Sequence, residues 1–235
     1  MQEEPGDART DVPPFDDLLE SAARLQELVP DAVLVGGTAA ALHAGHRVSV
    51  DHDHVLGDLR DRFDIVLEAL EREGEWVTNR VRAGKIILGE LGDIEAGVRQ
   101  LIRTRPLETE RHRLPSGRVL TVPTFDETLR VKAFLIVKRN QTRDYLDVAA
   151  LSVHSGVEHA ARVLARIDDY YSDQVHDEGP VSTQVAIQLA APRPKDASVT
   201  RRLSTYKALD RRWWSWQSTV EVCHDVAREM TRAVR

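Results

Sequence analysis

Up to about residue 123, the apolar residues of this chain follow a helical pattern in some segments and a strand-like pattern in others. Beyond that residue only the helical pattern continues. Before that point, apolar side chains recur either at helical spacing or in short runs typical of buried strands. The expected helices are 15–28, 38–43 and 59–70, and the expected strands are 32–35, 48–53, 76–80, 85–91, 94–98 and 119–122. The pattern therefore predicts an α/β (α+β) unit built on a small mixed sheet.

After Pro123 the pattern is helical throughout. Thr124 and Glu127 have the spacing of a capping box, in which each side chain satisfies a free amide at the start of a helix. The expected helices are 125–139, a second from 142 and a third at 157–171, with a connection at 191–195. We expect three parts: an acidic flexible tail at 1–14, a mixed-sheet core at 15–123 and a C-terminal helical bundle at 124–235.

The last part of the chain carries a heptad-like seam. Its apolar side chains alternate spacings of three and four: Tyr206, Leu209, Trp213, Trp216, Val220, Cys223, Ala227, Met230 and Val234. Two interpretations follow. Either one or two helices pack on the rest of the same chain, or the seam binds a second copy or another protein, so that both a monomer and a dimer are compatible with the pattern.

Composition indicates the class of protein and the cellular compartment. The chain has 235 residues, of which 42% are apolar, so a sizeable core is expected. No apolar run approaches the length of about 18 residues that a membrane span needs, and the acidic start does not resemble a secretory signal. Cys223 is the single cysteine, which excludes a disulfide within the chain and favours the reducing cytoplasm.

The residues with the strongest chemical signal are Val35-Gly36-Gly37-Thr38, followed by the segment from Arg47 to Asp53. Side chains alternate along a strand, so four polar residues are expected on one face: Arg47, Ser49, Asp51 and Asp53. His52 and His54 fall on the opposite face. We therefore expect these histidines in the core or behind the aspartates rather than in a transition-metal site.

This order of residues is typical of a site for a nucleoside triphosphate and its metal ions. Mg²⁺ prefers hard oxygen ligands and is often held by a few carboxylates and substrate phosphates, which Asp51 and Asp53 could share. Gly36 and Gly37 allow the backbone to approach a ligand closely. The helix expected to begin near Thr38 would direct free amides and its positive dipole end at a phosphate.

Taken together, Gly36-Gly37-Thr38 and Arg47-x-Ser49-x-Asp51-x-Asp53 resemble the signature of the DNA polymerase β-like nucleotidyltransferase superfamily. A second pattern, Lys132 followed by Arg143-Asp144-Tyr145-Leu146-Asp147, is similar to that of the AbiEii-type toxin branch, which includes MenT toxins. The resemblance extends over about residues 33–151. It implies a nucleotidyltransferase core followed by helices.

The resemblance also implies a role for each matching residue. The implied catalytic residues are Asp51, Asp53, Lys132, Asp144 and Asp147. The implied nucleotide-binding residues are Gly36, Gly37, Thr38, Ser49, Arg47, Lys132 and Arg143. Asp51 and Asp53 would ligate Mg²⁺, with Mn²⁺ as the alternative. Glu95, ahead of Asp93, is the candidate for a third metal ligand, because members of the superfamily often carry a further carboxylate on a neighbouring strand.

The implied activity is transfer of NMP from an NTP to RNA, with the tRNA 3′ end as the expected acceptor and a cognate antitoxin as an expected partner. Arginines crowd residues 99–118, which favours contact with an RNA backbone, although acidic residues interleave with them. Two alternatives stay open. One is a nucleotidyltransferase that acts on a protein or an antibiotic, and the other is a non-catalytic nucleotide-binding module.

Overall fold

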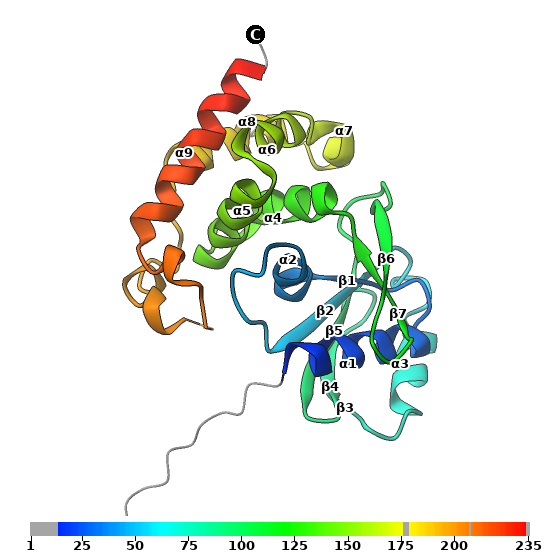
Figure 1. Ribbon diagram of the computed structural model, residues 1–235. Helices are drawn as coiled ribbons and strands as arrows, with labels where there is room; N and C mark the ends of the chain where they lie inside the picture. Colours follow the sequence, from blue (N-terminus) through cyan, green and yellow to red (C-terminus); the bar gives the residue numbers. More distant parts are fainter. Residues whose placement is uncertain (1–13, 176–178, 207, 234–235) are drawn as a thin grey trace, which may run out of the picture.

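Figure 1 shows the computed structural model, which describes residues 14–175, 179–206 and 208–233. The predicted acidic tail at 1–14 lies outside the described residues, apart from Pro14. Every described strand precedes residue 124, and the described elements after it are helical. The structure therefore confirms a small mixed-sheet core followed by a C-terminal helical bundle.

A five-stranded sheet forms the centre of the first part of the chain. Its strands lie in the order β1 (Val33–Val35), β2 (Asp51–Leu56), β5 (Ile94–Gln100), β4 (Ile86–Leu91) and β3 (Trp76–Arg82). β2 and β5 are parallel, and the other neighbouring pairs are antiparallel. Because parallel strands need a crossover, α3 (Phe63–Glu71) and the β3–β4 hairpin connect β2 to β5.

The sheet has one covered face and one face that looks toward the later helices (Figure 1). α1 (Phe15–Leu28) and α3 pack on the covered face, where Leu25 and Val66 join Ile87 and Val98 in one buried cluster. α2 (Gly36–Ala44) lies over the other face and contacts β2 as well as the helical part. Because α1 and α3 cover one face of the sheet, a site can form only on the face that looks toward the helical part.

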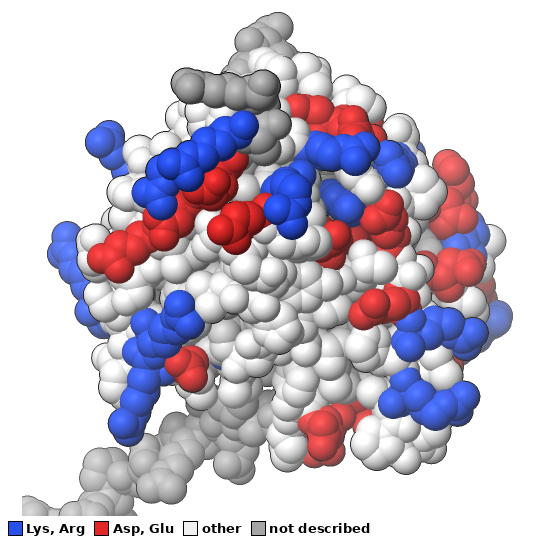
Figure 2. Space-filling view, turned by 45° about the horizontal axis from the view of Figure 1, so that its top comes forward, with Lys and Arg blue, Asp and Glu red and all other residues white. Residues whose placement is uncertain are grey.

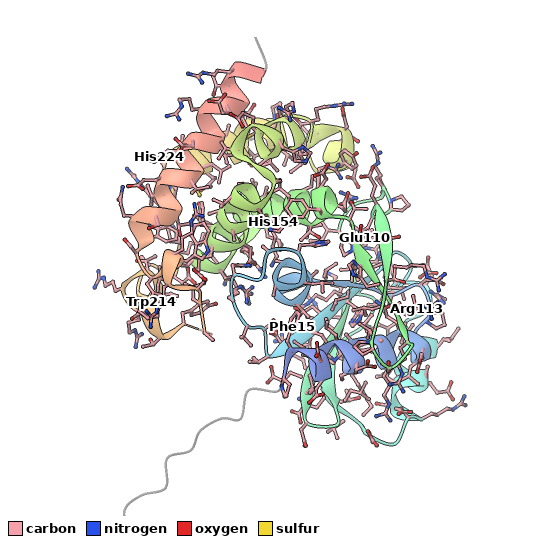
Figure 3. The ribbon with its side chains drawn as sticks, in the orientation of Figure 1. Phe15, Glu110, Arg113, His154, Trp214 and His224 are labelled. Atoms are coloured by element: carbon pink, nitrogen blue, oxygen red, sulfur yellow. The ribbon has the colours of Figure 1, made fainter. Side chains whose placement is uncertain are left out.

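A smaller two-stranded sheet joins β6 (Thr109–Arg113) to β7 (Val119–Pro123). Leu120 and Val122 of β7 are buried against α1, whereas β6 consists of Thr-Glu-Arg-His-Arg and has no apolar side chain. Glu110 and Arg113 lie along this strand (Figure 3). Sequence analysis missed β6 because pairing with β7, not burial of its own side chains, makes it a strand.

The helical part begins at α4 and has a continuous core. Its helices are α4 (Phe125–Arg139), α5 (Thr142–Ser155), α6 (Val157–Ala165), α7 (Asp168–Tyr171), α8 (Val181–Ala190) and α9 (Trp216–Ala233). Short 3₁₀ helices connect some of them: Ser172–Gln174, Val199–Arg201, Leu203–Thr205 and Arg211–Trp213. α9 packs along α6, α8 and α5 (Figure 1).

The C-terminal seam is largely occupied by packing within the chain. Trp213, Cys223 and Met230 are buried in the core of the helical part. The helix begins only at Trp216, because the Asp210 side chain caps a 3₁₀ helix ahead of it and Ala208 has a positive φ of 45°. A continuous helix from residue 206 is therefore wrong, and Val234 lies outside the described residues.

Only half of the predicted capping box forms. The Thr124 side chain accepts a hydrogen bond from the Glu127 amide at 3.3 Å, as expected. The Thr124 amide, however, donates to the Glu108 carbonyl. The Glu127 carboxylate instead lies within 2.6 Å of Arg103 Nη2 and accepts from Arg130 Nη1 at 2.7 Å. Two buried arginines draw it away from the helix start.

Both histidines of β2 lie on the covered face of the sheet, as their parity predicted. His52 and His54 are 1% and 0% exposed, and His52 Nε2 lies 3.1 Å from the Ser21 hydroxyl of α1. Burial lowers the pKa of His52 to about 4 and the pKa of His54 well below its ordinary value. The folded protein therefore holds both rings neutral at neutral pH.

Stability should fall as the pH drops below about 6.5 because the unfolded chain binds protons there that the folded histidines do not. For His52, a pKa near 4 in the folded state predicts a loss of about 2 kcal/mol in the free energy of unfolding between pH 7 and pH 5. Urea unfolding at the two pH values measures this loss.

His52→Gln should reduce the difference, whereas His224→Gln should leave it unchanged, because His224 is exposed on α9 (Figure 3). An equal pH dependence in wild type and His52→Gln would contradict the assignment.

Candidate functional site

A cavity of about 650 Å³ lies over the free face of the sheet, between β2, β5 and the helical part. This volume is within the usual range for small-molecule sites. Residues from the Gly-Gly turn (Gly36 and Gly37, the start of α2), from β2 and from α4 line it, so segments far apart in the sequence share one space. The predicted site residues that line it are Gly36, Gly37, Arg47, Ser49, Asp51, Asp53, Glu95, Lys132 and Arg143.

Asp51 and Asp53 are two residues apart on β2 and both line the cavity. In the parallel pairing with β5, Asp51 lies opposite Glu95 and Asp53 lies opposite Gly97. A Cβ on Gly97 would lie 3.0 Å from Asp53 Oδ1 and 2.7 Å from Leu88 Cδ2. Gly97, which sequence analysis did not single out, therefore leaves the Asp53 carboxylate room to bind a ligand.

The carboxylate pair fits a hard cation such as Mg²⁺ or Mn²⁺ because its donors are oxygens at adjacent positions of one strand face. Within the described part of the chain, no group of three or more His, Cys, Asp and Glu side chains is arranged to hold a metal. Glu95 faces Asp51 in register but does not complete such a group. An ion at this pair would take its remaining oxygen ligands from water or substrate.

Arg99 lies beside Asp53, one of the two carboxylates of the pair. Its Nε donates to Asp53 Oδ1 at 3.1 Å, and the two side chains are 44% and 31% exposed. β5 places Arg99 two residues beyond Gly97, on the same face of the sheet. Sequence analysis grouped Arg99 with the basic residues of 99–118 and did not connect it with Asp53.

The strand that carries the pair begins later than predicted. β2 starts at Asp51 rather than at residue 48, so Arg47 and Ser49 are not on the strand and their alternation was wrong. The backbone ahead of β2 hydrogen-bonds with the helical part instead of with the sheet: the His46 carbonyl accepts from the Asp210 amide. Arg47 and Ser49 nevertheless line the cavity, because tertiary contacts hold them there.

Two hydroxyl groups brace the start of β2. Thr38 is fully buried, lies outside the cavity lining and donates to the Asp51 carbonyl at 2.6 Å. Ser49 lines the cavity, and its hydroxyl lies 3.3 Å from both the Asp51 carbonyl and Asp51 Oδ1. Of the two hydroxyls predicted for phosphate contact, Ser49 is therefore the one that faces the cavity.

Asp147 is the centre of a buried ionic cluster. Arg47 donates to it through Nε at 2.8 Å and Nη2 at 3.1 Å, and Lys132 Nζ lies 2.6 Å from Oδ2. His46 Nε2 lies 2.7 Å from Oδ1. Burial raises the pKa of Asp147, but the charges of Arg47 and Lys132 outweigh it and hold that pKa well below its ordinary value.

Gly37 makes this cluster possible. A Cβ at position 37 would lie 2.5 Å from Arg47 Nη2 and 3.0 Å from Ser49 Oγ. The guanidinium therefore fills the space that any other residue's side chain would need. The Gly-Gly turn and the pair of Arg47 with Asp147 depend on each other.

Asp144 pairs with Arg139 of α4 rather than with its neighbour in sequence, Arg143. It is fully buried and accepts from Arg139 Nε at 2.7 Å and Nη2 at 2.6 Å. Arg143 does not pair with it, and within the described residues Arg143 Nε has no hydrogen-bond partner. Asp144 and Asp147 lie behind the cavity, whereas Arg139 and Arg143 line it.

Cationic side chains thus gather around the carboxylate pair. The cationic side chains that line the same cavity are Arg47, Arg80, Arg99, Arg103, Lys132, Arg139 and Arg143. Within the described part of the chain, Arg80 and Arg143 have no carboxylate within ion-pair distance. A ligand with several negative charges could therefore bind cations that have no carboxylate partner as well as cations that would exchange their partner for the ligand.

The basic segment 99–118 does not form one surface. Arg103 is buried against Glu127, Arg105 lies over the Tyr170 ring at 3.9 Å, and Arg118 pairs with Glu20 and Glu27. On the face shown in Figure 2, acidic and basic side chains are interspersed around a broad uncharged area. Arg103, Arg105 and Arg118 therefore have partners within the chain, while contact of this segment with an RNA backbone stays a prediction.

No known family profile matches the chain. Among curated proteins, the chain is similar to part of MmpL11 proteins. It is 33% identical over 219 residues to the heme uptake protein MmpL11 of Mycobacterium tuberculosis, with 82% of this chain and 21% of that protein covered. It is 37% identical over 226 residues to the mycolic acid-containing lipids exporter MmpL11 of Mycolicibacterium smegmatis, with 91% and 21% covered. The chain spans about a fifth of the length of these relatives.

Two solved structures share the architecture. MenT4, a nucleotidyltransferase toxin from Mycobacterium tuberculosis, matches with a TM-score of 0.56 and 19% identity over 92% of this chain and 82% of that chain. JHP933 from Helicobacter pylori matches with a TM-score of 0.51 and 16% identity over 94% and 92%. The chain has the fold of a nucleotidyltransferase. This confirms the expected superfamily architecture, while the AbiEii-type branch stays a prediction.

Among the described residues, no helix is both long enough and apolar enough to cross a bilayer.

Asp147→Asn should be strongly destabilising, because it leaves Arg47 and Lys132 buried without their counter-charge. Removing one partner of a buried ion pair costs about 3–5 kcal/mol, which chemical unfolding would measure. Asp225→Asn is the matched control, because Asp225 pairs with Arg228 at 2.6 Å but is 47% exposed. Its loss should stay below about 1 kcal/mol. Equal losses in the two variants would contradict the central role of Asp147.

Proposed function

We propose that the chain is a metal-dependent nucleotidyltransferase that transfers NMP from an NTP to an acceptor hydroxyl and releases pyrophosphate. One observation carries the proposal. The carboxylates Asp51 and Asp53 on β2 share a single cavity with cationic side chains of α4 and α5, such as Lys132 and Arg143. Phosphoryl transfer needs this combination of metal-binding oxygens and charges that neutralise phosphate.

Asp51 and Asp53 would hold the Mg²⁺ ions, with Mn²⁺ as the alternative. When bound, such ions stabilise charge on the attacking and leaving oxygens of an in-line displacement. Thr38 and Ser49 position Asp51 through its backbone carbonyl, and Ser49 also lies near its carboxylate. Arg99 pairs with Asp53 while no ion competes for it and would contact phosphate once displaced.

The triphosphate would lie between the Gly-Gly turn and α4. α2 begins at Gly36, so its first amides and its positive dipole end are available beside the cavity. Arg139 and Arg143 would face the phosphates from the helical part. Lys132 lines the cavity while it pairs with Asp147, so it would act as a fixed positive charge.

In the reaction, a bond forms between the acceptor oxygen and the α-phosphorus, and the bond from that phosphorus to the pyrophosphate oxygen breaks. The acceptor hydroxyl releases its proton to solvent, and pyrophosphate leaves with the electron pair of the broken bond. This chain's contribution is to hold both groups in line and to neutralise the leaving group. Asp144 and Asp147, behind the cavity, are assigned to positioning Arg139, Arg47 and Lys132.

The favoured role is that of an AbiEii-type toxin acting in the cytoplasm on the 3′ end of tRNA and neutralised by a cognate antitoxin. The motif resemblance and the shared fold with MenT4 support it. We assign residues 15–123 to the nucleotidyltransferase core and 124–235 to a helical domain. Glu95 is retained as a ligand that would join only when substrate is bound, because it lies opposite Asp51 in register.

A second candidate function is a nucleotide-binding module without catalysis. The observation that favours it is the identity of 33–37% with a segment of MmpL11 transport proteins. In such a setting the cavity would bind a nucleotide and report its presence to another protein.

Substitution of either carboxylate should abolish transfer. Asp51→Asn and Asp53→Asn remove a metal-binding charge, so Mg²⁺-dependent turnover should fall by at least about a hundredfold while the fold is retained. The assay incubates each labelled NTP with total RNA, total protein and an aminoglycoside, and identifies which one becomes labelled. Asp64→Asn is the control, because Asp64 is an exposed carboxylate on α3.

Each outcome separates the candidates. Label on RNA that disappears with Asp51→Asn supports the toxin-type reaction. Label on protein or on the aminoglycoside would show that this molecule, and not RNA, is the acceptor. Nucleotide binding without Mg²⁺-dependent turnover favours the module. Full transfer by Asp51→Asn would refute the metal assignment.

A further inference from the structure

An irregularity in β3, an edge strand of the five-stranded sheet, determines which of its side chains reach the cavity. Trp76 and Thr78 lie on the covered face: Trp76 is buried in the core of that face, and the Thr78 hydroxyl donates to Glu71 of α3 at 3.0 Å. Because side chains alternate along a regular strand, Arg80 would follow Trp76 and Thr78 onto the covered face. It would then have no access to the cavity.

A β-bulge turns Arg80 to the other face of the sheet. In the pairing of β3 with β4, Thr78 lies opposite Gly89 and Arg80 lies opposite Leu88, so the register shifts at Asn79. A shift of one residue exchanges the two faces of a strand. Arg80 and Leu88 accordingly both line the cavity. The bulge, rather than the alternation along the sequence, therefore brings this cation to the site.

Side chains around the bulge hold it in place. Trp76 Nε1 donates to the Thr78 hydroxyl at 2.9 Å. A Cβ on Gly89 would lie 2.5 Å from Trp76 Cζ2, so the Trp76 ring needs a glycine at the position opposite Thr78. Asn79 Nδ2 donates to Glu90 Oε1 at 2.9 Å, which ties the bulged residue to β4. The bulge is therefore part of the packing of β3 on β4.

Arg80 is available to a ligand. It is exposed, and among the described residues it forms no ion pair. Bulges and charged side chains also protect the edges of sheets against pairing with other chains. A charge on either face of β3 would serve that purpose, so edge protection does not explain why Arg80 is turned into the cavity.

Arg80 lies in one row across the sheet with the carboxylate Asp53. The pairings run from Asp53 to Gly97, from Gly97 to Leu88 and from Leu88 to Arg80. Neighbouring strands are about 4.8 Å apart, so this row spans about 14 Å between its first and last backbone positions. Gly97 has no side chain and Leu88 is apolar, so the two ends carry the only charges of the row. A ligand that lies over it can contact a metal ion at Asp53 and the guanidinium of Arg80.

The order of the strands determines the side from which the acceptor enters. α2, whose first amides are assigned to the triphosphate, follows β1 directly and lies on one side of β2, whereas β5, β4 and β3 lie on the other. In an in-line displacement, the attacking and leaving oxygens lie on opposite sides of the phosphorus. With pyrophosphate on the side of β1, the acceptor hydroxyl enters from the side of β5, β4 and β3. Arg80 is on that side.

We infer that Arg80 binds a phosphate of the acceptor and thereby selects a nucleic acid strand over a cationic acceptor such as an aminoglycoside. The guanidinium donates hydrogen bonds to a phosphodiester in the nucleotides that precede the reacting hydroxyl. An aminoglycoside carries amines that are protonated at neutral pH, which Arg80 repels. This role of Arg80 rests on the proposed function, because the position of the triphosphate determines the side of the acceptor. Arg80 is a specificity-determining residue that lies outside the sequence motifs.

The first test measures RNA binding without turnover. Fluorescence anisotropy of fluorescein-labelled total tRNA gives the dissociation constant at several salt concentrations. Arg80→Gln should weaken binding at least about threefold at low salt and reduce the slope of log affinity against log salt by about one, because one phosphate contact is lost. Arg80→Lys retains the charge and should keep the slope of the wild type.

Arg82→Gln is the matched control for this measurement. Arg82 lies opposite Ile86, on the same face of β3 as Arg80, but outside the cavity lining. Its substitution should leave the slope unchanged. A wild-type slope in Arg80→Gln, or equal reductions in Arg80→Gln and Arg82→Gln, would overturn the role of Arg80.

The second test separates the acceptor from the nucleotide in the transfer reaction. With total tRNA as acceptor, Arg80→Gln should raise the KM for tRNA at least about tenfold and change the KM for the NTP less than about twofold, because Arg80 is on the acceptor side. A purely structural role would change both values. Transfer to a protein or an aminoglycoside in place of RNA would overturn the selection that is assigned to Arg80.

The two proposals fail in different ways. If the wild-type chain transfers NMP to no acceptor in the presence of Mg²⁺, the proposed function fails and the role of Arg80 fails with it. If the wild type transfers NMP to RNA and Arg80→Gln does so with the same KM for tRNA as Arg82→Gln, only the role of Arg80 is refuted.

Discussion

A single buried carboxylate, Asp147, balances the charges on which the rest of the site depends. It holds Arg47 from the segment before β2 and Lys132 from α4, so it joins the sheet to the helices at the cavity wall. Buried cations are tolerated only when they are paired, because desolvation is otherwise too costly. The absence of a side chain at Gly37 is part of the same constraint, because the Arg47 guanidinium occupies that space.

The chemistry of the site is divided between two parts of the chain. The sheet contributes the carboxylates Asp51 and Asp53, and the helices contribute Lys132, Arg139 and Arg143. A second buried cluster keeps these parts together: Glu127 on α4 contacts Arg103 from the segment after β5 and Arg130 from its own helix. The capping box is half-formed for this reason, since Glu127 stabilises the junction instead of the start of α4.

Two kinds of protein are similar to this chain, one in fold and the other in sequence. MenT4 is a nucleotidyltransferase toxin of similar architecture, whereas the MmpL11 relatives are much longer transport proteins that match this chain over about a fifth of their length. A fold can serve several functions, so the residues of the site must decide between them. Here the paired carboxylates and the cations that line the same cavity are the basis on which we propose a nucleotide as the ligand.

The sequence by itself determined most of the elements before residue 124, apart from β6, and the parity of β2 from Asp51 to His54. It also supplied the residues that are proposed to carry the chemistry. These are local properties: His52 and His54 are buried because side chains alternate along a strand. Tertiary structure alone decided the partners, because charge pairing depends on distances that no local pattern contains. It placed Asp147 rather than a strand neighbour beside Arg47, gave Asp144 to Arg139, and made β6 a strand through pairing alone. It also brought Leu101 and Leu135, which are far apart in the sequence, to the lining of one cavity.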